Sequence, residues 1–132
     1  MVGHQGAWGG FVKNIFLILL SVSLAVFGQV FLKKGMMSIG EIPFNISTPF
    51  FLLGKVFTNF KLFIGFALFG LSSVVWLVVL SKVELSFAYP MVSTGYILTI
   101  LISWKFLGET ISPVRWIAVV VICAGVALLA KS

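Results

Sequence analysis

The chain has 132 residues, of which 61% are hydrophobic and only 9% carry a charged side chain. Soluble domains carry roughly 25% charged residues, so this composition excludes a protein whose whole surface faces water. The formal net charge of +6 does not indicate a nucleic-acid-binding protein, because no basic helix or aromatic-interleaved basic patch lies outside the apolar stretches. We interpret the basic residues instead as markers of helix ends and as contacts to anionic lipid.

Four apolar stretches are each close to the roughly 20 residues that a helix needs to cross a bilayer. They predict transmembrane helices over about residues 12–32, 61–80, 86–107 and 113–130 of a single domain, residues 1–132. The first helix is expected to end at Lys33-Lys34-Gly35, because a basic last turn followed by glycine is typical of helix C-termini. The predicted fold class is an all-α membrane protein with four transmembrane helices.

The segment 33–60 between the first two spans is predicted to be a loop that contains an interfacial segment. Glycine, proline and asparagine in its first half indicate irregular structure, and Ser47 or Thr48 with Pro49 is a helix start signal. The stretch from there to Phe60 is aromatic but too short to span a bilayer. It fits an interfacial helix or an extended lead-in to the second span.

Basic residues are more numerous in the first and third connections than at the opposite end of the predicted bundle. The first set contains Lys33, Lys34, Lys55, Lys61, Lys105 and Arg115, and the second contains Lys13, Lys82 and Lys131. The positive-inside rule favours a cytoplasmic location for the first set, with both termini outside. The bias is modest, so dual insertion is also left open.

Polar residues follow the third predicted span at intervals of three or four positions. They are Ser86, Tyr89, Ser93, Tyr96, Thr99 and Ser103, which fall on one arc of roughly 140° at about 100° per residue. This stripe could make hydrogen bonds between helices or form the wall of a water-accessible cavity. Pro90 adds weight to the cavity, because proline kinks a helix and frees a backbone carbonyl.

The first span has a face with Ser21, Ala25, Gly28 and Gln29. An amide such as that of Gln29 could bond to another helix, a contact worth about 0.6–2 kcal/mol in membranes. It could equally donate to a sugar hydroxyl or a phosphate.

No aspartate or glutamate lies inside a predicted span. A proton-coupled exporter of organic cations needs a carboxylate in its binding cavity, and Ala25 occupies the position where we would look for one. Glu84 and Glu109 flank the third span, and Glu84 is the one acid that could replace such a group. Glu109 could simply pair with Arg115 or Lys105.

Lys33, Lys34, Lys105 and Arg115 are predicted to gather at one membrane face. Ammonium and guanidinium groups bind phosphate through charge-assisted hydrogen bonds, so this cluster is a candidate phosphate site at headgroup depth. An equally good alternative for each residue alone is topology determination or lipid anchoring. Because the chain has one histidine, one cysteine and no P-loop or nucleophile elbow, we predict no catalytic residues, metal site or cofactor.

The second half of the chain carries four short motifs in a recognisable order. They are VWLVVL at 75–80, AYPMVS at 88–93, GETISPVRW at 108–116 and ICAGVALL at 122–129. Together they resemble the small multidrug resistance-like branch of the drug/metabolite transporter superfamily, and they are most similar to the flippase subunits for undecaprenyl phosphate-aminoarabinose. Gly28-Gln29 followed by Lys33 is similar to the end of the first helix in that family.

The resemblance implies an SMR-like or EamA-like half-transporter in the cell membrane that forms a homodimer, or a heterodimer with a similar four-helix subunit. Helices 1 to 3 would line a cavity and helix 4 would form the dimer seam, where Ala124, Gly125 and Ala127 offer a surface of small residues. The implied substrate is a lipid-linked sugar phosphate. Multidrug members carry a glutamate in helix 1, and the departure at Ala25 argues against drug export.

The leading hypothesis is therefore a flippase that moves a polyprenyl-phosphate-linked monosaccharide between leaflets. The alternatives are a proton-coupled exporter of small cations or metabolites and a non-transporting partner subunit. We assign the phosphate to Lys33, Lys34, Lys105 and Arg115, the sugar and the cavity lining to Gln29, Tyr89, Pro90, Ser93, Tyr96 and Ser21, and a coupling or ion-pair role to Glu84 and Glu109.

Overall fold

The structure, a computed structural model, describes the backbone of residues 4–131 and the side chains of residues 10–131. This part of the chain is helical and contains no strand. Its elements are α1 (His4–Ile39), α2 (Thr48–Thr58), α3 (Phe60–Leu80), α4 (Leu85–Met91), the 3₁₀ turn η1 (Val92–Thr94), α5 (Gly95–Phe106) and α6 (Pro113–Lys131).

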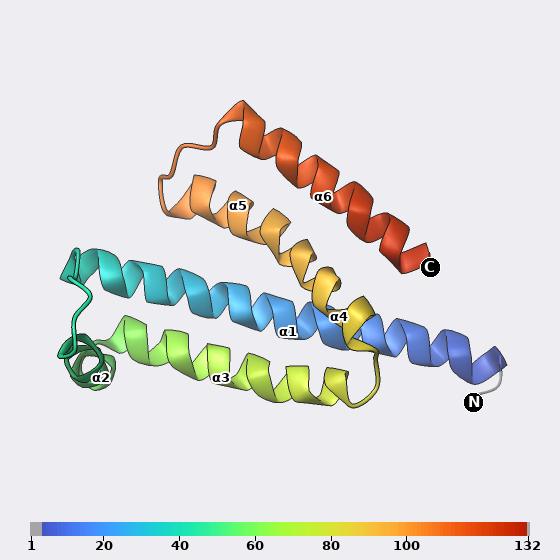
Figure 1. The fold of residues 1–132 in the computed structure, drawn as a ribbon, viewed down its shortest axis with the longest axis horizontal. Helices are drawn as coiled ribbons and strands as arrows, with labels where there is room; N and C mark the ends of the chain where they lie inside the picture. The colour runs from blue at the N-terminus through green and yellow to red at the C-terminus, as the bar shows by residue number, and fades with distance from the viewer. Residues whose placement is uncertain (1–3, 132) are drawn as a thin grey trace.

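Four stretches of these helices are long and apolar enough to cross a membrane. They cover Gly10–Ile39, Phe60–Leu80, Leu85–Phe106 and Pro113–Lys131. The predicted fold class is thus confirmed. The start of α1, the end of α6 and the α3–α4 turn lie at one end of the bundle, and the connections around α2 and between α5 and α6 lie at the other (Figure 1).

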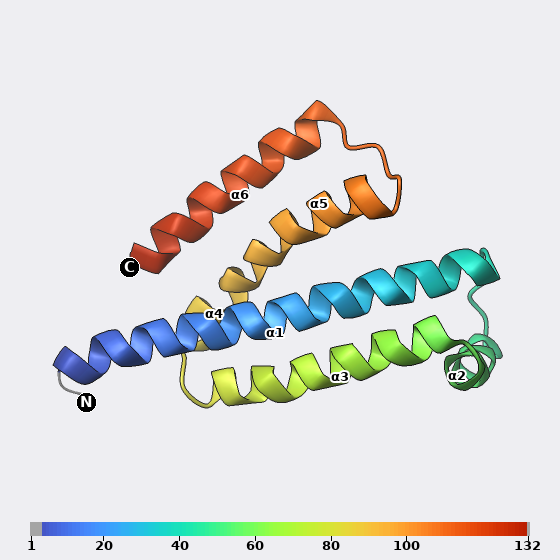
Figure 2. The same ribbon diagram turned by 180° about the vertical axis from the view of Figure 1, so that it is seen from behind.

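The helices α1 and α3 form a long antiparallel pair that is held by small residues (Figures 1 and 2). A Cβ added to Gly28 would lie 2.9 Å from the carbonyl oxygen of Gly65, so the two backbones touch at this point. About two helical turns before Gly28 on α1, the Ser21 hydroxyl donates to the Ser72 carbonyl at 2.9 Å, and the Ser72 hydroxyl donates to the Ser21 carbonyl at 2.7 Å. In lipid, close backbone contact and hydrogen bonds of this kind are what hold two helices together.

The first helix is longer than the sequence predicts at both ends. It begins at His4 and continues through Lys33-Lys34-Gly35 to Ile39. Gly35 is buried against Leu62 of α3 and does not end the helix, whereas Gly40 has a φ of +95° and its N–H donates to the Met36 carbonyl at 2.8 Å. Gly35 is therefore a packing residue, and the left-handed backbone that terminates the helix belongs to Gly40.

The third span is interrupted in its first half. Its helix passes from α4 through η1 to α5 just after Pro90, which lacks the N–H that an uninterrupted α-helix would use. Beyond the interruption, Gly95 packs on α1, because a Cβ added there would lie 2.7 Å from Val22 and 3.3 Å from Val26. The core of the protein lies where these elements cross α1 and includes the fully buried Ile18 and Val79.

The last helix, α6, lies at the edge of the molecule against α4 and η1 (Figure 2). Among its described residues only Val119 is buried. In Figures 1 and 2, the short helix α2 is viewed along its axis, whereas α1 and α3 are viewed from the side. The helix α2 therefore lies crosswise at the end of the bundle where α1 ends and α3 begins.

Candidate functional site

The four predicted phosphate-binding residues lie at the same end of the bundle, on three different helices. Lys33 and Lys34 are near the end of α1, Lys105 is in the last turn of α5, and Arg115 is in the first turn of α6. Lys33, Lys105 and Arg115 are exposed, and Lys34 is half-buried. This end also holds α2 with Lys55 and the start of α3 with Lys61, as the uneven charge distribution in the sequence predicts.

The position of Arg115 does not stabilise α6, the helix that contains it. The Ser112 hydroxyl accepts from the Arg115 N–H at 3.3 Å and Pro113 opens α6, which together make an ordinary helix start. A cation in the first turn, however, opposes the helix dipole by about 0.3–1 kcal/mol. A role in topology or in ligand binding accounts better for this arginine than the stability of α6.

A groove between α5 and α6 brings Arg115 together with part of the polar stripe. It has a volume of about 230 Å³ and contains Tyr96, Thr99 and Arg115, with the aliphatic remainder supplied by Ile100, Ala118, Val119 and Ile122. Toward the loop end, the rings of Trp104 and Trp116 meet edge to face with centroids 6.1 Å apart. Arg115 and Tyr96 therefore line the same groove, but its surface is apolar, so neither the guanidinium group nor the phenol oxygen faces into it.

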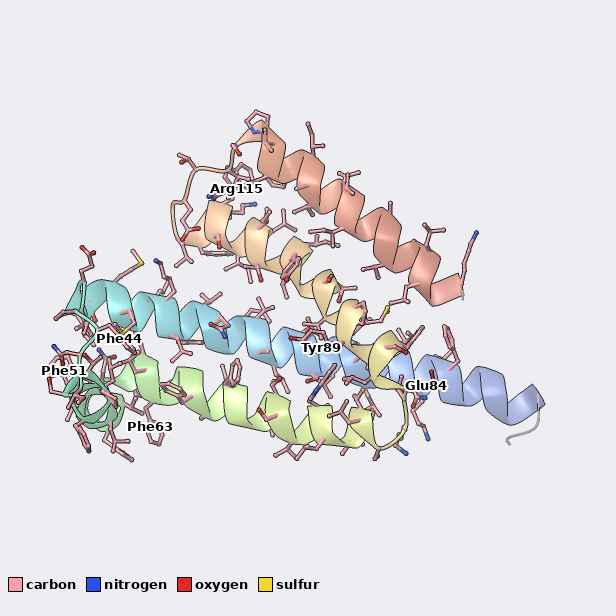
Figure 3. All side chains as sticks on the ribbon, in the orientation of Figure 1. Phe44, Phe51, Phe63, Glu84, Tyr89 and Arg115 are labelled. Atoms are coloured by element: carbon pink, nitrogen blue, oxygen red, sulfur yellow. The ribbon has the colours of Figure 1, made fainter. Side chains whose placement is uncertain are left out.

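The rest of the stripe is largely uncovered by the chain's own helices. Tyr89 is 67% exposed and Tyr96 51%, Pro90 is exposed, and Ser93 is half-buried. Tyr89 lies on α4 nearer to Glu84 than to Arg115 (Figure 3). The hydroxyls are thus accessible from outside the single chain and are not sealed against another of its helices.

The two predicted residues of α1 differ in their surroundings. Ser21 is only 3% exposed and its hydroxyl is engaged with Ser72, although both residues also line a pocket of about 210 Å³ together with Ala25 and Trp76. Gln29 is exposed, one residue after the Gly28 contact with α3. Ser21 therefore has a packing role in any event, whereas the amide of Gln29 projects away from the buried seam.

The two flanking acids are far from each other. Glu84 is the exposed N-cap residue of α4 at the end opposite the basic cluster, as Figure 3 shows, and Glu109 lies half-buried in the α5–α6 connection. The Glu109 N–H donates to the Ser103 carbonyl at 3.0 Å. No ion pair joins either carboxylate to a lysine or to Arg115 within the described side chains.

Sequence reasoning missed the partners of the α1 face. It did not identify Gly65 and Ser72 of α3. These two residues are seven positions apart, and so are Ser21 and Gly28 of α1. A matching seven-residue spacing of small residues on two spans was the available signal, because such a spacing keeps residues on one helix face.

Comparison with known proteins places this architecture in a family. Residues 15–130 match the sequence profile of putative transmembrane family 234. Curated relatives include proteins from Escherichia coli (strain 55989) and Shigella boydii serotype 18, both named "Probable 4-amino-4-deoxy-L-arabinose-phosphoundecaprenol flippase subunit ArnE". Each is 33% identical over 95 residues, which cover 70% of this chain and 86% of the relative. No solved structure gives a significant match.

These similarities confirm the resemblance to the aminoarabinose-lipid flippase subunits that the second-half motifs indicate. They also relate the chain to proteins that are named as flippase subunits. With its four candidate spans, this multi-pass protein of the cell membrane belongs to putative transmembrane family 234 and is related to the ArnE flippase subunits.

Proposed function

We propose that this protein is one subunit of a flippase that moves a polyprenyl-phosphate-linked monosaccharide between the leaflets of the membrane. The observation that carries the proposal is the gathering of the four cations assigned to the phosphate at one end of the bundle, together with the exposed Tyr89 and Tyr96 of the third span. Fixed positive charge at headgroup depth is thereby combined with hydroxyl-bearing side chains that continue into the span. The relationship to subunits named as flippases for an undecaprenol-linked sugar supports the same substrate class.

In this proposal the basic end and the stripe have separate tasks. Lys33, Lys34, Lys105 and Arg115 bind the phosphate through charge-assisted hydrogen bonds. The hydroxyls of Tyr89, Ser93 and Tyr96 and the amide of Gln29 replace water around the sugar, because an unpaired polar group in an apolar medium costs several kcal/mol. The polyprenyl chain stays in lipid. The absence of aspartate and glutamate from the predicted spans agrees with an anionic head group.

The proposal includes a second four-helix subunit, either another copy of this chain or a similar protein. The helix α6 supports this, because only Val119 is buried among its described residues. Ala124, Gly125 and Ala127 are all exposed, and nothing lies within 4 Å of a Cβ added to Gly125. Small exposed residues of this kind allow a helix of a second subunit to approach closely. The relatives are themselves named as subunits.

Reconstitution in liposomes tests the transport. Purified protein, alone or with a similar small subunit, is expected to move a lipid-linked aminoarabinose phosphate from one leaflet to the other. The double variant Lys33→Gln/Lys34→Gln is expected to lose translocation and to keep dimer formation, because both residues lie outside the small-residue surface of α6. The matched control, Lys13→Gln/Lys82→Gln, removes the same charge from the opposite end. Equal activity of the two double variants would refute the phosphate assignment.

A further inference from the structure

A second polar feature lies where α2 crosses the ends of α1 and α3. A pocket of about 570 Å³ opens there, and it is lined by Ser38 of α1, by Lys55 and Thr58 of α2 and by Asn59, with Phe51 and Phe60 at its border. Its lining contains none of the four cations that we assign to the transported phosphate. It also contains no carboxylate.

The donors in this pocket that are not already engaged favour an anion. Lys55 is half-buried and its Nζ lies 5.4 Å from the centre of the Phe51 ring, a cation–π contact that limits where the ammonium can point. Asn59 Nδ2 donates one hydrogen to Ser38 Oγ at 3.3 Å, which leaves its second N–H available. The hydroxyls of Ser38 and Thr58 donate to carbonyls of their own helices. The free donors are therefore an ammonium group and an amide N–H.

The same pocket lies at the end of the bundle, beside a helix that exposes aromatic side chains. The helix α2 contains no buried residue, and large phenylalanines stand exposed on and around it, with Phe44 98%, Phe50 75% and Phe57 72% exposed. Figure 3 shows Phe44, Phe51 and Phe63 gathered at this end of the bundle. A short helix that lies across the ends of spanning helices and exposes aromatic rings belongs in the membrane interface, with its rings at the acyl boundary.

We infer that this pocket binds the phosphate of an anionic phospholipid, with Lys55 as the cation and Asn59 as the neutral donor. The exposed phenylalanines contact the acyl chains, which a free phosphate ion lacks. The bound lipid would hold α2 against the ends of α1 and α3. This inference concerns a resident lipid, and it does not depend on whether the protein transports a lipid-linked sugar.

Equilibrium binding of phosphatidylglycerol to the purified full chain in neutral detergent, followed by native mass spectrometry, tests the inference. Lys55→Gln is expected to weaken binding by about tenfold or more, because a hydrogen bond to a charged group contributes roughly 1.5–3 kcal/mol. Lys61→Gln is the matched control, since it removes the same charge from an exposed position of α3 that does not line the pocket. It is expected to leave binding unchanged.

A second variant keeps the inference testable if Lys55→Gln folds poorly. Asn59 Oδ1 accepts from the N–H groups of Lys61 and Leu62 at 3.0 and 3.4 Å and so caps α3. Asn59→Asp keeps this cap, removes the amide donors and adds a negative charge, so it should retain helicity and lose phosphatidylglycerol. Equal losses in Lys55→Gln and Lys61→Gln, equal binding of phosphatidylcholine, or full competition by inorganic phosphate would each overturn the inference.

Discussion

The contact between Gly28 and Gly65 makes the pairing of α1 and α3 sensitive to a single methyl group. A Cβ added to Gly65 would lie 2.9 Å from the Gly28 carbonyl oxygen and 2.7 Å from Leu32 Cγ. Leu32 could change its rotamer, but the carbonyl oxygen is part of the α1 backbone and cannot move without the helix. Gly65→Ala should therefore push the two helices apart.

The size of the effect follows from two opposing contributions. Overpacking of a close contact costs about 1–3 kcal/mol, whereas replacing glycine by alanine inside a helix returns up to about 1 kcal/mol through backbone propensity. Gly70→Ala on the same helix isolates the first contribution, because nothing lies within 4 Å of a Cβ added there. We expect Gly65→Ala to be about 1–3 kcal/mol less stable than Gly70→Ala.

Unfolding in mixed micelles with increasing dodecyl sulfate, followed by circular dichroism, measures this difference. At about 1.4 kcal/mol per factor of ten, the expected difference changes the unfolding equilibrium constant by about 5- to 140-fold. If Gly65→Ala proves as stable as Gly70→Ala, the two helices do not touch at this point. The small-residue seam described above would then be refuted.

Two further predictions concern the same seam and the outer face of α6. Ser72→Ala removes the hydrogen bond from the Ser72 hydroxyl to the Ser21 carbonyl and leaves the bond from the Ser21 hydroxyl to the backbone carbonyl of residue 72. It should lower the free energy of unfolding by about 0.6 kcal/mol and at most about 1.7. Ser73→Ala is the control, because the Ser73 hydroxyl bonds to the Phe69 carbonyl of its own helix, and equal losses would contradict the pairing. Gly125→Leu should leave the fold of the single chain intact, because the space around it is open, and should lower the dimer fraction measured by in-membrane crosslinking. A dimer fraction that matches that of Gly70→Leu would argue against a seam at α6.

Much of the candidate site was predictable because its ingredients are local. The accumulation of Lys33, Lys34, Lys105 and Arg115 at one end follows from counting charges between spans, and the bundle places them there. Their proximity to the stripe was not predictable. Arg115 and Tyr96 come from different helices, and whether they line one groove depends on how α5 and α6 are rotated about their axes.

The end of α1 shows why a local signal can mislead. Lys33-Lys34-Gly35 has the composition of a helix C-terminus, yet Gly35 is used to admit Leu62 of α3, and the helix ends at Gly40. The sequence does not distinguish a glycine that permits a close contact from a glycine that adopts a positive φ. Only the position of the neighbouring helix distinguishes them.

By itself, the sequence determined the all-α class, the four membrane spans and the end of the bundle that carries most of the positive charge. These properties depend on the hydropathy and charge of contiguous residues, which determine how a segment inserts into a bilayer whatever its tertiary contacts. The tertiary structure alone decided that Ser21 bonds to Ser72, that Gly28 meets Gly65, and that Lys55 and Asn59 share a pocket. Contacts between residues distant in the chain depend on the rotation and crossing of packed helices, which no short stretch of sequence specifies.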